Sequence, residues 1–248
     1  MPKRDTYHHG DLRRVLIEAA LELVTERGPK GFTLTEVAKR SGVSIAAPYR
    51  HFADKSHLLA AVATVSFDQF HAALTEPATT GEGPSLLIEL GQRYVHWALH
   101  NAAAYQVMFG IDVDRGEHPE LVEAADRAFD VVLRAARPVS TRSRPPLDDA
   151  RNLAGALWAL GHGIVTLHIG GDLRHARIRT PTNELGAAAT AALLAGLGPS
   201  SPHLTTRTSP TSHTTATSPT ASPTPTRKKR LTESARATST RSSPRPGT

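Results

Sequence analysis

A group of donor-bearing and small side chains between residues 45 and 55 has the chemistry needed to contact DNA. Arg50 can bond the O6 and N7 atoms of guanine, and the small Ala46 and Ala47 let the backbone approach the groove and can touch thymine methyl groups. Hydroxyl, imidazole and ammonium groups suit phosphate oxygens, which position a protein without reading the base sequence. We expect a groove-facing surface made of Ile45, Ala46, Ala47 and Arg50, bordered by Tyr49, His51 and Lys55.

The sequence around these residues is patterned as a helix, a turn and a second helix. Thr33 or Thr35 can cap the first helix, and Gly42 supplies the positive φ that ends it. Ser44 can cap the second helix, which in helix-turn-helix proteins enters the major groove. Pro48 falls near the fourth position of that helix and lacks an N–H group. We therefore expect a tightened or delayed first turn, with base contacts shifted by about one or two residues.

Roughly residues 8–60 resemble the DNA-binding domain of the TetR family of bacterial transcriptional regulators. The resemblance rests on the pattern Tyr-x-His-Phe-x-x-Lys at 49–55 and on Tyr-His-His-Gly-Asp-Leu at 7–12. Ile45 and Pro48 depart from the polar and aliphatic residues that are usual in the family. The resemblance implies base contacts from Ser44, Ala46, Ala47 and Arg50 and phosphate contacts from Thr35, Tyr49, His51 and Lys55.

The composition favours a protein of the cytoplasm. The sequence has no cysteine, so it forms neither disulfides nor thiolate metal sites. Its first residues, Met-Pro-Lys-Arg-Asp, lack the apolar stretch of a secretory signal. No run of about 18 apolar residues predicts a membrane span. We therefore expect a cytoplasmic protein that has no membrane partner.

The formal charge of +6 is distributed unevenly along the chain. Residues 1–57 carry ten basic and seven acidic residues, whereas residues 58–197 carry eleven basic and fifteen acidic residues. The DNA-facing end is therefore positive and the remainder of the folded part is negative, a polarity that orients a protein on DNA.

The last residues, 198–248, form a tail rich in Ser, Thr, Pro and Arg, with eight basic residues against one acidic residue. Large apolar side chains are too few there for a core, so we expect the tail to be disordered. The Arg-Lys-Lys-Arg cluster at 227–230 either adds a sequence-independent phosphate contact or belongs to an inert solvated extension.

The sequence predicts an all-α fold with two domains. A three-helix, homeodomain-like helix-turn-helix domain is expected at 1–57, and a helical effector-binding and dimerisation domain at 58–197. Apolar residues at spacings of three and four predict a first helix that ends at Gly28-Pro29. Further helices are expected from Lys55 to about Leu74 and near 85–101, 102–109, 118–137, 147–169 and 183–197.

Aromatic and imidazole side chains of the second domain are candidates for a small-molecule site, because apolar pockets between helices with a few polar anchors usually hold such ligands. Trp158-x-x-x-His162-Gly163 resembles a signature of one branch of TetR C-terminal domains, where the family typically binds its effector. The alternative that each residue simply belongs to the core stays open. The candidates are Phe67, Phe70, His71, Trp97, His100, Tyr105, Met108, Phe109, Trp158 and His162, with Tyr94 among the same aromatic residues.

The sequence holds no motif for catalysis or for a cofactor. It lacks a glycine-rich phosphate loop, a nucleophile elbow, a His-Glu-x-x-His helix and a cysteine nucleophile. His96 and His100 have a spacing that can share a metal ion, but no nearby acid or cysteine completes the set. We therefore predict neither an enzyme nor a metal site.

The last two predicted helices are rich in small residues, including Gly155, Gly161, Gly163 and Gly186, which allow close helix packing. Helix-turn-helix proteins commonly pair to read two half-sites related by symmetry, and the resemblance implies a four-helix bundle made of two helices from each subunit.

We expect a homodimeric repressor that binds a palindromic operator in double-stranded DNA and is released by a small-molecule effector. A transcriptional activator on the same scaffold and a non-specific architectural protein that uses the basic tail are the alternatives.

Overall fold

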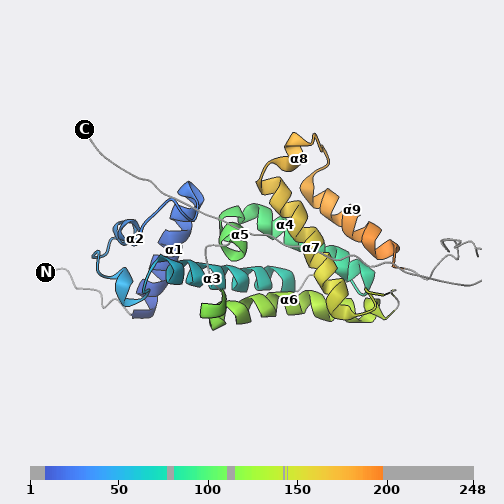
Figure 1. Ribbon diagram of the computed structural model, residues 1–248, viewed down its shortest axis with the longest axis horizontal. Coiled ribbons are helices and arrows are strands. Elements are labelled where there is room, and N and C mark those ends of the chain that lie inside the picture. The colour runs from blue at the N-terminus through green and yellow to red at the C-terminus, as the bar shows by residue number, and fades with distance from the viewer. Residues whose placement is uncertain (1–8, 77–80, 111–114, 142, 144, 198–248) are drawn as a thin grey trace, which may run out of the picture. The chain divides into compact units, whose positions relative to one another are not determined.

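The computed structural model shows only helices and the segments that connect them among the residues that it describes, which are 9–76, 81–110, 115–141, 143 and 145–197 (Figure 1). The predicted all-α fold is confirmed, and the tail at 198–248 lies outside the described residues. The α-helices are α1 (His9–Arg27), α2 (Leu34–Arg40), α3 (Lys55–Thr75), α4 (Pro84–His100), α5 (Ala102–Phe109), α6 (Pro119–Ser140), α7 (Ala150–Ile169), α8 (Asp172–His175) and α9 (Thr182–Ala195). Two 3-10 helices are η1 (Pro48–Arg50) and η2 (Arg115–Glu117).

The ends of α1 and α2 follow from local capping signals. α1 is followed by Gly28, whose φ of 75° lets the chain turn away from the helix. Thr33, rather than Thr35, is the N-cap of α2: its side chain accepts a hydrogen bond from the Glu36 N–H, and the Glu36 carboxylate accepts one from the Thr33 N–H. Gly42, with a φ of 67°, turns the chain after α2 as the sequence predicts.

The segment after that turn is a tight 3-10 structure rather than an α-helix capped by Ser44. η1 begins at Pro48 with Ala47 in the N-cap position, and no side chain caps it. The Ala47 N–H donates to the Ser44 carbonyl, three residues back, at 2.9 Å, because Pro48 has no N–H to offer to that oxygen. The predicted cap at Ser44 is therefore wrong, whereas the predicted tightening at Pro48 is confirmed.

α3 joins the helix-turn-helix segment to the other helices. Asp54 caps it by accepting a hydrogen bond from the His57 N–H at 3.0 Å, and the helix runs unbroken through the expected domain boundary between residues 57 and 58. α3 packs against α1, α5 and α6. Among the described helices, α3 is the one long and apolar enough to cross a membrane, but 56% of its apolar window is buried inside the protein, as in a core helix.

The helices that follow α3 enclose an apolar interior in which α9 packs against α4 and α7 packs against α6 (Figure 1). Glycine makes this packing possible: a Cβ atom at Gly186 would lie 3.0 Å from the Val95 Cγ2 atom, and one at Gly161 would lie 3.3 Å from the Tyr94 ring. The helices predicted in this region are found within a turn of their expected ends. α8 is an exception, because its four residues fall in a segment that the sequence predicts as a loop.

Candidate functional site

The surface formed by the end of the turn and by η1 is open to solvent. Ser44, Ala46 and Arg50 are exposed, and Ile45 and Tyr49 expose 55% and 54% of their surface. We call these five residues the reading face. Because none of them is buried in the core, their side chains are available to a partner.

Ala47 is part of the core and not of the reading face. It is only 8% exposed, and the neighbouring Pro48 is buried as well. The expectation of a groove-facing Ala47 is therefore wrong. The error has a physical cause, because the prediction assumed a helix that Ser44 caps, whereas the helical segment begins at Pro48 and is a 3-10 turn.

Lys55 connects two parts of the helix-turn-helix segment. Its Nζ atom donates to the Phe32 carbonyl oxygen at 2.7 Å and lies 4.2 Å from the centroid of the Phe32 ring. This Lys55–Phe32 clamp ties the loop before α2 to the first turn of α3. Thr35, His51 and Lys55 are each half-buried. The three expected phosphate contacts that lie outside the reading face are therefore only partly exposed.

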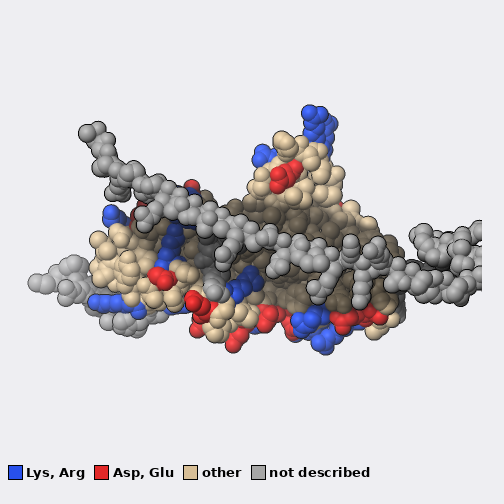
Figure 2. Space-filling model, viewed as in Figure 1, with Lys and Arg blue, Asp and Glu red and all other residues tan. Residues whose placement is uncertain are grey.

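Charge is arranged differently around α1 and α2 than along α6. Arg40 holds Glu26 through two hydrogen bonds of 2.7 Å, and this contact lowers the pKa of the Glu26 carboxyl group. Arg27 holds Glu36 at 2.7 Å, so part of the basic charge near α1 and α2 is neutralised locally. Figure 2 shows acidic surface, with basic patches among it, along the lower edge of the view. The exposed acidic residues of α6 are Glu120, Glu123, Asp126 and Asp130.

The aromatic residues expected to bind a ligand form one packed group in the interior. Phe70 is fully buried at its centre, with ring centroids 5.1 Å from Tyr94, 5.0 Å from Trp97 and 5.9 Å from Trp158. Such edge-to-face and tilted contacts stabilise a core beyond the burial of apolar area. Five of the candidates are therefore core residues in the described arrangement, namely Phe67, Phe70, Trp97, Tyr105 and Met108.

A chain of hydrogen bonds runs through this aromatic group. The Tyr94 and Tyr105 hydroxyl groups are 2.8 Å apart, and the Tyr105 hydroxyl is 2.7 Å from the Nδ1 atom of His162. Burial raises the pKa of Tyr94 and raises that of Tyr105 to about 12. Burial, with the nearby Arg115 charge, lowers the pKa of His162, so near neutral pH the imidazole is uncharged and both phenols are protonated.

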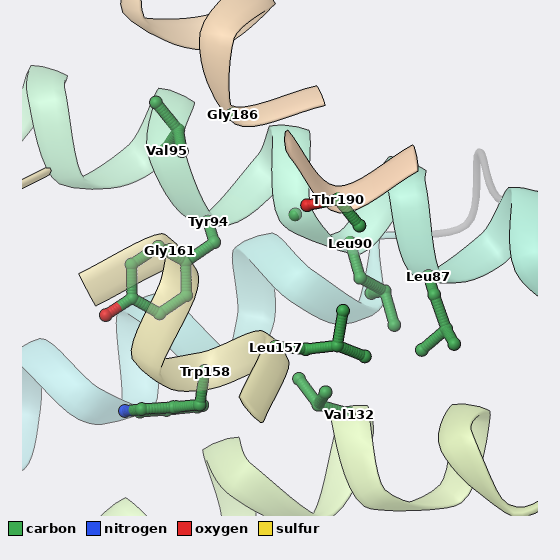
Figure 3. A pocket seen from close by; sticks show the side chains of 11 residues that line it. Leu87, Leu90, Tyr94, Val95, Val132, Leu157, Trp158, Gly161, Gly186 and Thr190 are labelled. Carbon is green, nitrogen blue, oxygen red and sulfur yellow. The ribbon is translucent and has the colours of Figure 1, made fainter. Parts of the chain in front are cut away.

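Next to this group lies a small apolar cavity, into which side chains from α4, α6, α7 and α9 converge (Figure 3). Its volume of about 20 Å³ has room for roughly one water molecule. Of the sequence candidates, Trp158 lines it, and Tyr94 does so from the neighbouring helix. The aliphatic lining was not predicted from the sequence, although the glycines among the apolar residues of α4, α7 and α9 could have indicated it. The cavity is lined by Leu87, Leu90, Gly91, Tyr94, Val95, Val132, Leu157, Trp158, Gly161, Gly186 and Thr190.

Two histidine candidates do not join the aromatic group or the cavity. His100 is exposed on α4, where its Nδ1 atom is 2.8 Å from the His96 carbonyl oxygen and its ring is 4.1 Å from that of His96. His71 is half-buried on α3 and does not line the cavity. Within the described residues, no three His, Cys, Asp or Glu side chains are already grouped so that they could hold a metal ion.

Comparison with known proteins gives two family matches, one after the other in the described chain. Residues 16–62 match the family described as bacterial regulatory proteins, tetR family, and residues 87–193 match the tetracyclin repressor-like C-terminal domain. The HTH-type transcriptional regulator BetI of Rhizobium meliloti is 31% identical over 160 residues, which cover 61% of this chain and 75% of the relative. The HTH-type transcriptional regulator SrpR of Pseudomonas putida is 26% identical over 175 residues, which cover 66% and 78%.

Among solved structures, a protein of unknown function from Rhodococcus sp. RHA1 superposes with a TM-score of 0.66. It is 32% identical, and the alignment covers 79% of this chain and 100% of that structure. The similarity therefore extends over the helix-turn-helix segment and the helices that enclose the cavity.

Proposed function

The chain belongs to the TetR family of DNA-binding transcriptional regulators, and on that premise we propose that it is a homodimeric cytoplasmic repressor which a small-molecule effector releases from its operator. The reading face is the observation that carries this proposal. It places a guanidinium group, a hydroxyl group and apolar side chains together on a surface that the core does not use. The family is one of regulators and not of enzymes, so the cavity beside the interior aromatic group is assigned to effector binding rather than to catalysis.

On DNA, the reading face divides into base and phosphate contacts. Arg50 takes a guanine edge, while Ile45 and Ala46 touch apolar parts of the major groove, above all thymine methyl groups. Ser44 completes the base contacts. Phosphates are bound by the Tyr49 hydroxyl group on the face and by hydroxyl, imidazole and ammonium groups outside it, and these contacts set its orientation. These phosphate contacts come from Thr35, Tyr49, His51 and Lys55.

The dimer is proposed to form through α7 and α9. Leu167 on α7 leaves 44% of its surface exposed, and a Cβ atom built on Gly155 or on Gly163 meets nothing within 4 Å. This open side of α7 allows a second chain to approach closely. Gly161 and Gly186, which the sequence analysis grouped with these glycines, instead face Tyr94 and Val95 inside the chain.

Gly163→Leu tests that interface. A Cβ atom at this position meets nothing within 4 Å in the single chain, so we expect no loss of monomer stability, and leucine favours a helix over glycine by roughly 0.8 kcal/mol. In a dimer the same side chain clashes with the second chain, so sedimentation at micromolar concentration is expected to show monomers for the variant and dimers for the parent. A variant that stays dimeric contradicts an interface at this point of α7.

The proposed release by an effector follows from how tightly the interior is packed. Effector pockets for drug-sized molecules usually measure about 300–1,000 Å³, far more than the cavity between α4, α6, α7 and α9. A ligand that enters there must part these helices, and therefore binds a second arrangement better than the described one. α3 transmits the change, because it packs against α6 and also carries the helix-turn-helix segment. The ligand then lowers operator affinity by its preference for that arrangement.

A footprint on the DNA upstream of the chain's own gene tests the function as a whole. We expect protection of two half-sites about one helical turn apart, related by a two-fold axis. A screen against that complex is expected to yield compounds that abolish the protection, whereas a screen that yields only compounds that strengthen it contradicts release by an effector. Diffuse protection without a palindrome supports an architectural protein and contradicts the proposal.

A further inference from the structure

A second, larger cavity lies where the helix-turn-helix segment meets the start of α6. Its volume is about 370 Å³, and it is lined from α1, from the end of η1, from the start of α3 and from the turn before α6. Unlike the apolar cavity, it gathers polar and titratable side chains. Those relevant here are Arg13, His51, His57, Glu117, His118 and Glu120.

His57 is oriented in the way that a metal-binding histidine usually is. Its Nδ1 atom is 2.9 Å from the Asp54 carboxylate, which also accepts the His57 backbone N–H at 3.0 Å. A carboxylate partner of this kind orients the imidazole ring of a metal ligand, while the other ring nitrogen, Nε2, faces away from the carboxylate. His57 therefore offers its Nε2 atom as a ligand at the wall of this cavity.

His118 offers a second donor, which the described residues leave unused. Its Nε2 atom is buried and has no hydrogen-bond partner. Burying a polar nitrogen without a partner is unfavourable, so such an atom calls for an explanation. The His118 ring stands edge-on to the His57 ring, with centroids 5.0 Å apart and planes at 87°. His118 precedes the first turn of α6 and its side chain does not cap that helix.

The remaining ligands come from exposed carboxylates beside these two rings. Glu117 and Glu120 both line the cavity and are exposed, so their side chains can change rotamer at little cost. Since no three ligand side chains are already grouped, one of these glutamates must rotate to complete a set. Two imidazoles with a carboxylate and water suit a divalent transition metal, and the acidic residues disfavour an anion at the same place.

We propose that this cavity binds a divalent transition-metal ion such as Zn²⁺ through His57, His118 and one of the two glutamates. The ion joins the first turn of α3 to the start of α6, and so links the helix-turn-helix segment to the helices behind it. Metal binding fixes that junction in one arrangement, and operator affinity then depends on the metal. The metal site itself rests on the geometry of the cavity and not on the proposed repressor function.

The test uses the full chain, without an affinity tag, and Zn²⁺ and Co²⁺ as probes. We expect calorimetry to show about one Zn²⁺ per chain and Co²⁺ to give the visible absorption of nitrogen and oxygen ligation. His118→Gln and His57→Gln are each expected to weaken Zn²⁺ binding by at least about tenfold. Neither DNA nor an effector is present, so this result is independent of whether the chain represses transcription.

A matched control comes from the exposed histidine pair on α4, because His96→Gln with His100→Gln removes two neighbouring imidazoles elsewhere. That double variant is expected to bind Zn²⁺ like the parent. The proposal is overturned if the parent binds no Zn²⁺ at micromolar concentration, if His118→Gln and His57→Gln both bind like the parent, or if the α4 double variant loses the site. Thermal unfolding of every variant shows whether a loss of Zn²⁺ binding comes from a loss of the folded structure.

Discussion

Arg50→Ala is expected to weaken binding to the operator by about 5- to 150-fold, which corresponds to the roughly 1–3 kcal/mol that a bidentate arginine–guanine contact contributes. Arg50 is exposed, so the substitution removes the guanidinium group without opening a cavity in the core. Affinity for unrelated DNA is expected to fall much less, since only one positive charge is lost. Titration of a labelled operator and of a scrambled duplex, at one fixed salt concentration, measures both quantities.

Two controls distinguish the loss of a base contact by Arg50 from the loss of its positive charge. Arg134→Ala removes an exposed arginine on α6, away from the reading face, and is expected to leave operator affinity unchanged. An operator in which 7-deazaguanine replaces guanine lacks the N7 acceptor. The parent protein is expected to bind this operator less tightly than the normal one. The Arg50→Ala variant is expected to bind both operators equally tightly. Equal losses on specific and scrambled DNA for Arg50→Ala contradict a base contact and assign Arg50 to the phosphates.

Phe70→Ala is expected to lower the free energy of unfolding by about 3–5 kcal/mol, as truncation of a buried phenylalanine usually does. Phe70 is fully buried and contacts the rings of Tyr94, Trp97 and Trp158, which lie on two other helices. Removing the ring leaves a void between α3, α4 and α7 that these bulky side chains cannot fill without moving. Denaturant unfolding followed by circular dichroism measures the loss.

Val65→Ala is the matched control on the same helix. Val65 leaves 36% of its surface exposed, and its truncation is expected to change the free energy of unfolding by no more than about 0.5 kcal/mol. A Phe70→Ala variant as stable as Val65→Ala contradicts the assignment of the aromatic group as the centre of the core.

Local signals predicted most of the fold correctly. Capping residues, glycine turns and apolar residues at spacings of three and four are properties of short segments, so the ends of α1, α2 and α3 could be inferred from the sequence. The same reasoning anticipated the disturbance at Pro48, because the missing N–H is a property of that one residue. It did not predict the burial of Ala47, which depends on how far the 3-10 turn rotates the backbone.

The interior site was less accessible to sequence reasoning. Aromatic residues stand out in a sequence, and Trp158, Tyr105 and His162 do lie together in the structure. The cavity is lined mainly by aliphatic residues and glycines, whose roles are fixed by distances between helices and not by residue type. The His57–His118 contact joins positions 61 residues apart in number, so no local pattern could indicate it.

The Lys55–Phe32 clamp limits what a moving α3 can do to the DNA-binding segment. Because the ammonium group holds both the carbonyl oxygen and the ring of Phe32, the loop before α2 travels with the first turn of α3. The reading face is then displaced as a rigid body, with its internal geometry preserved. An effector is therefore expected to alter the separation between half-sites that a dimer can span, while the base preference within each half-site stays the same.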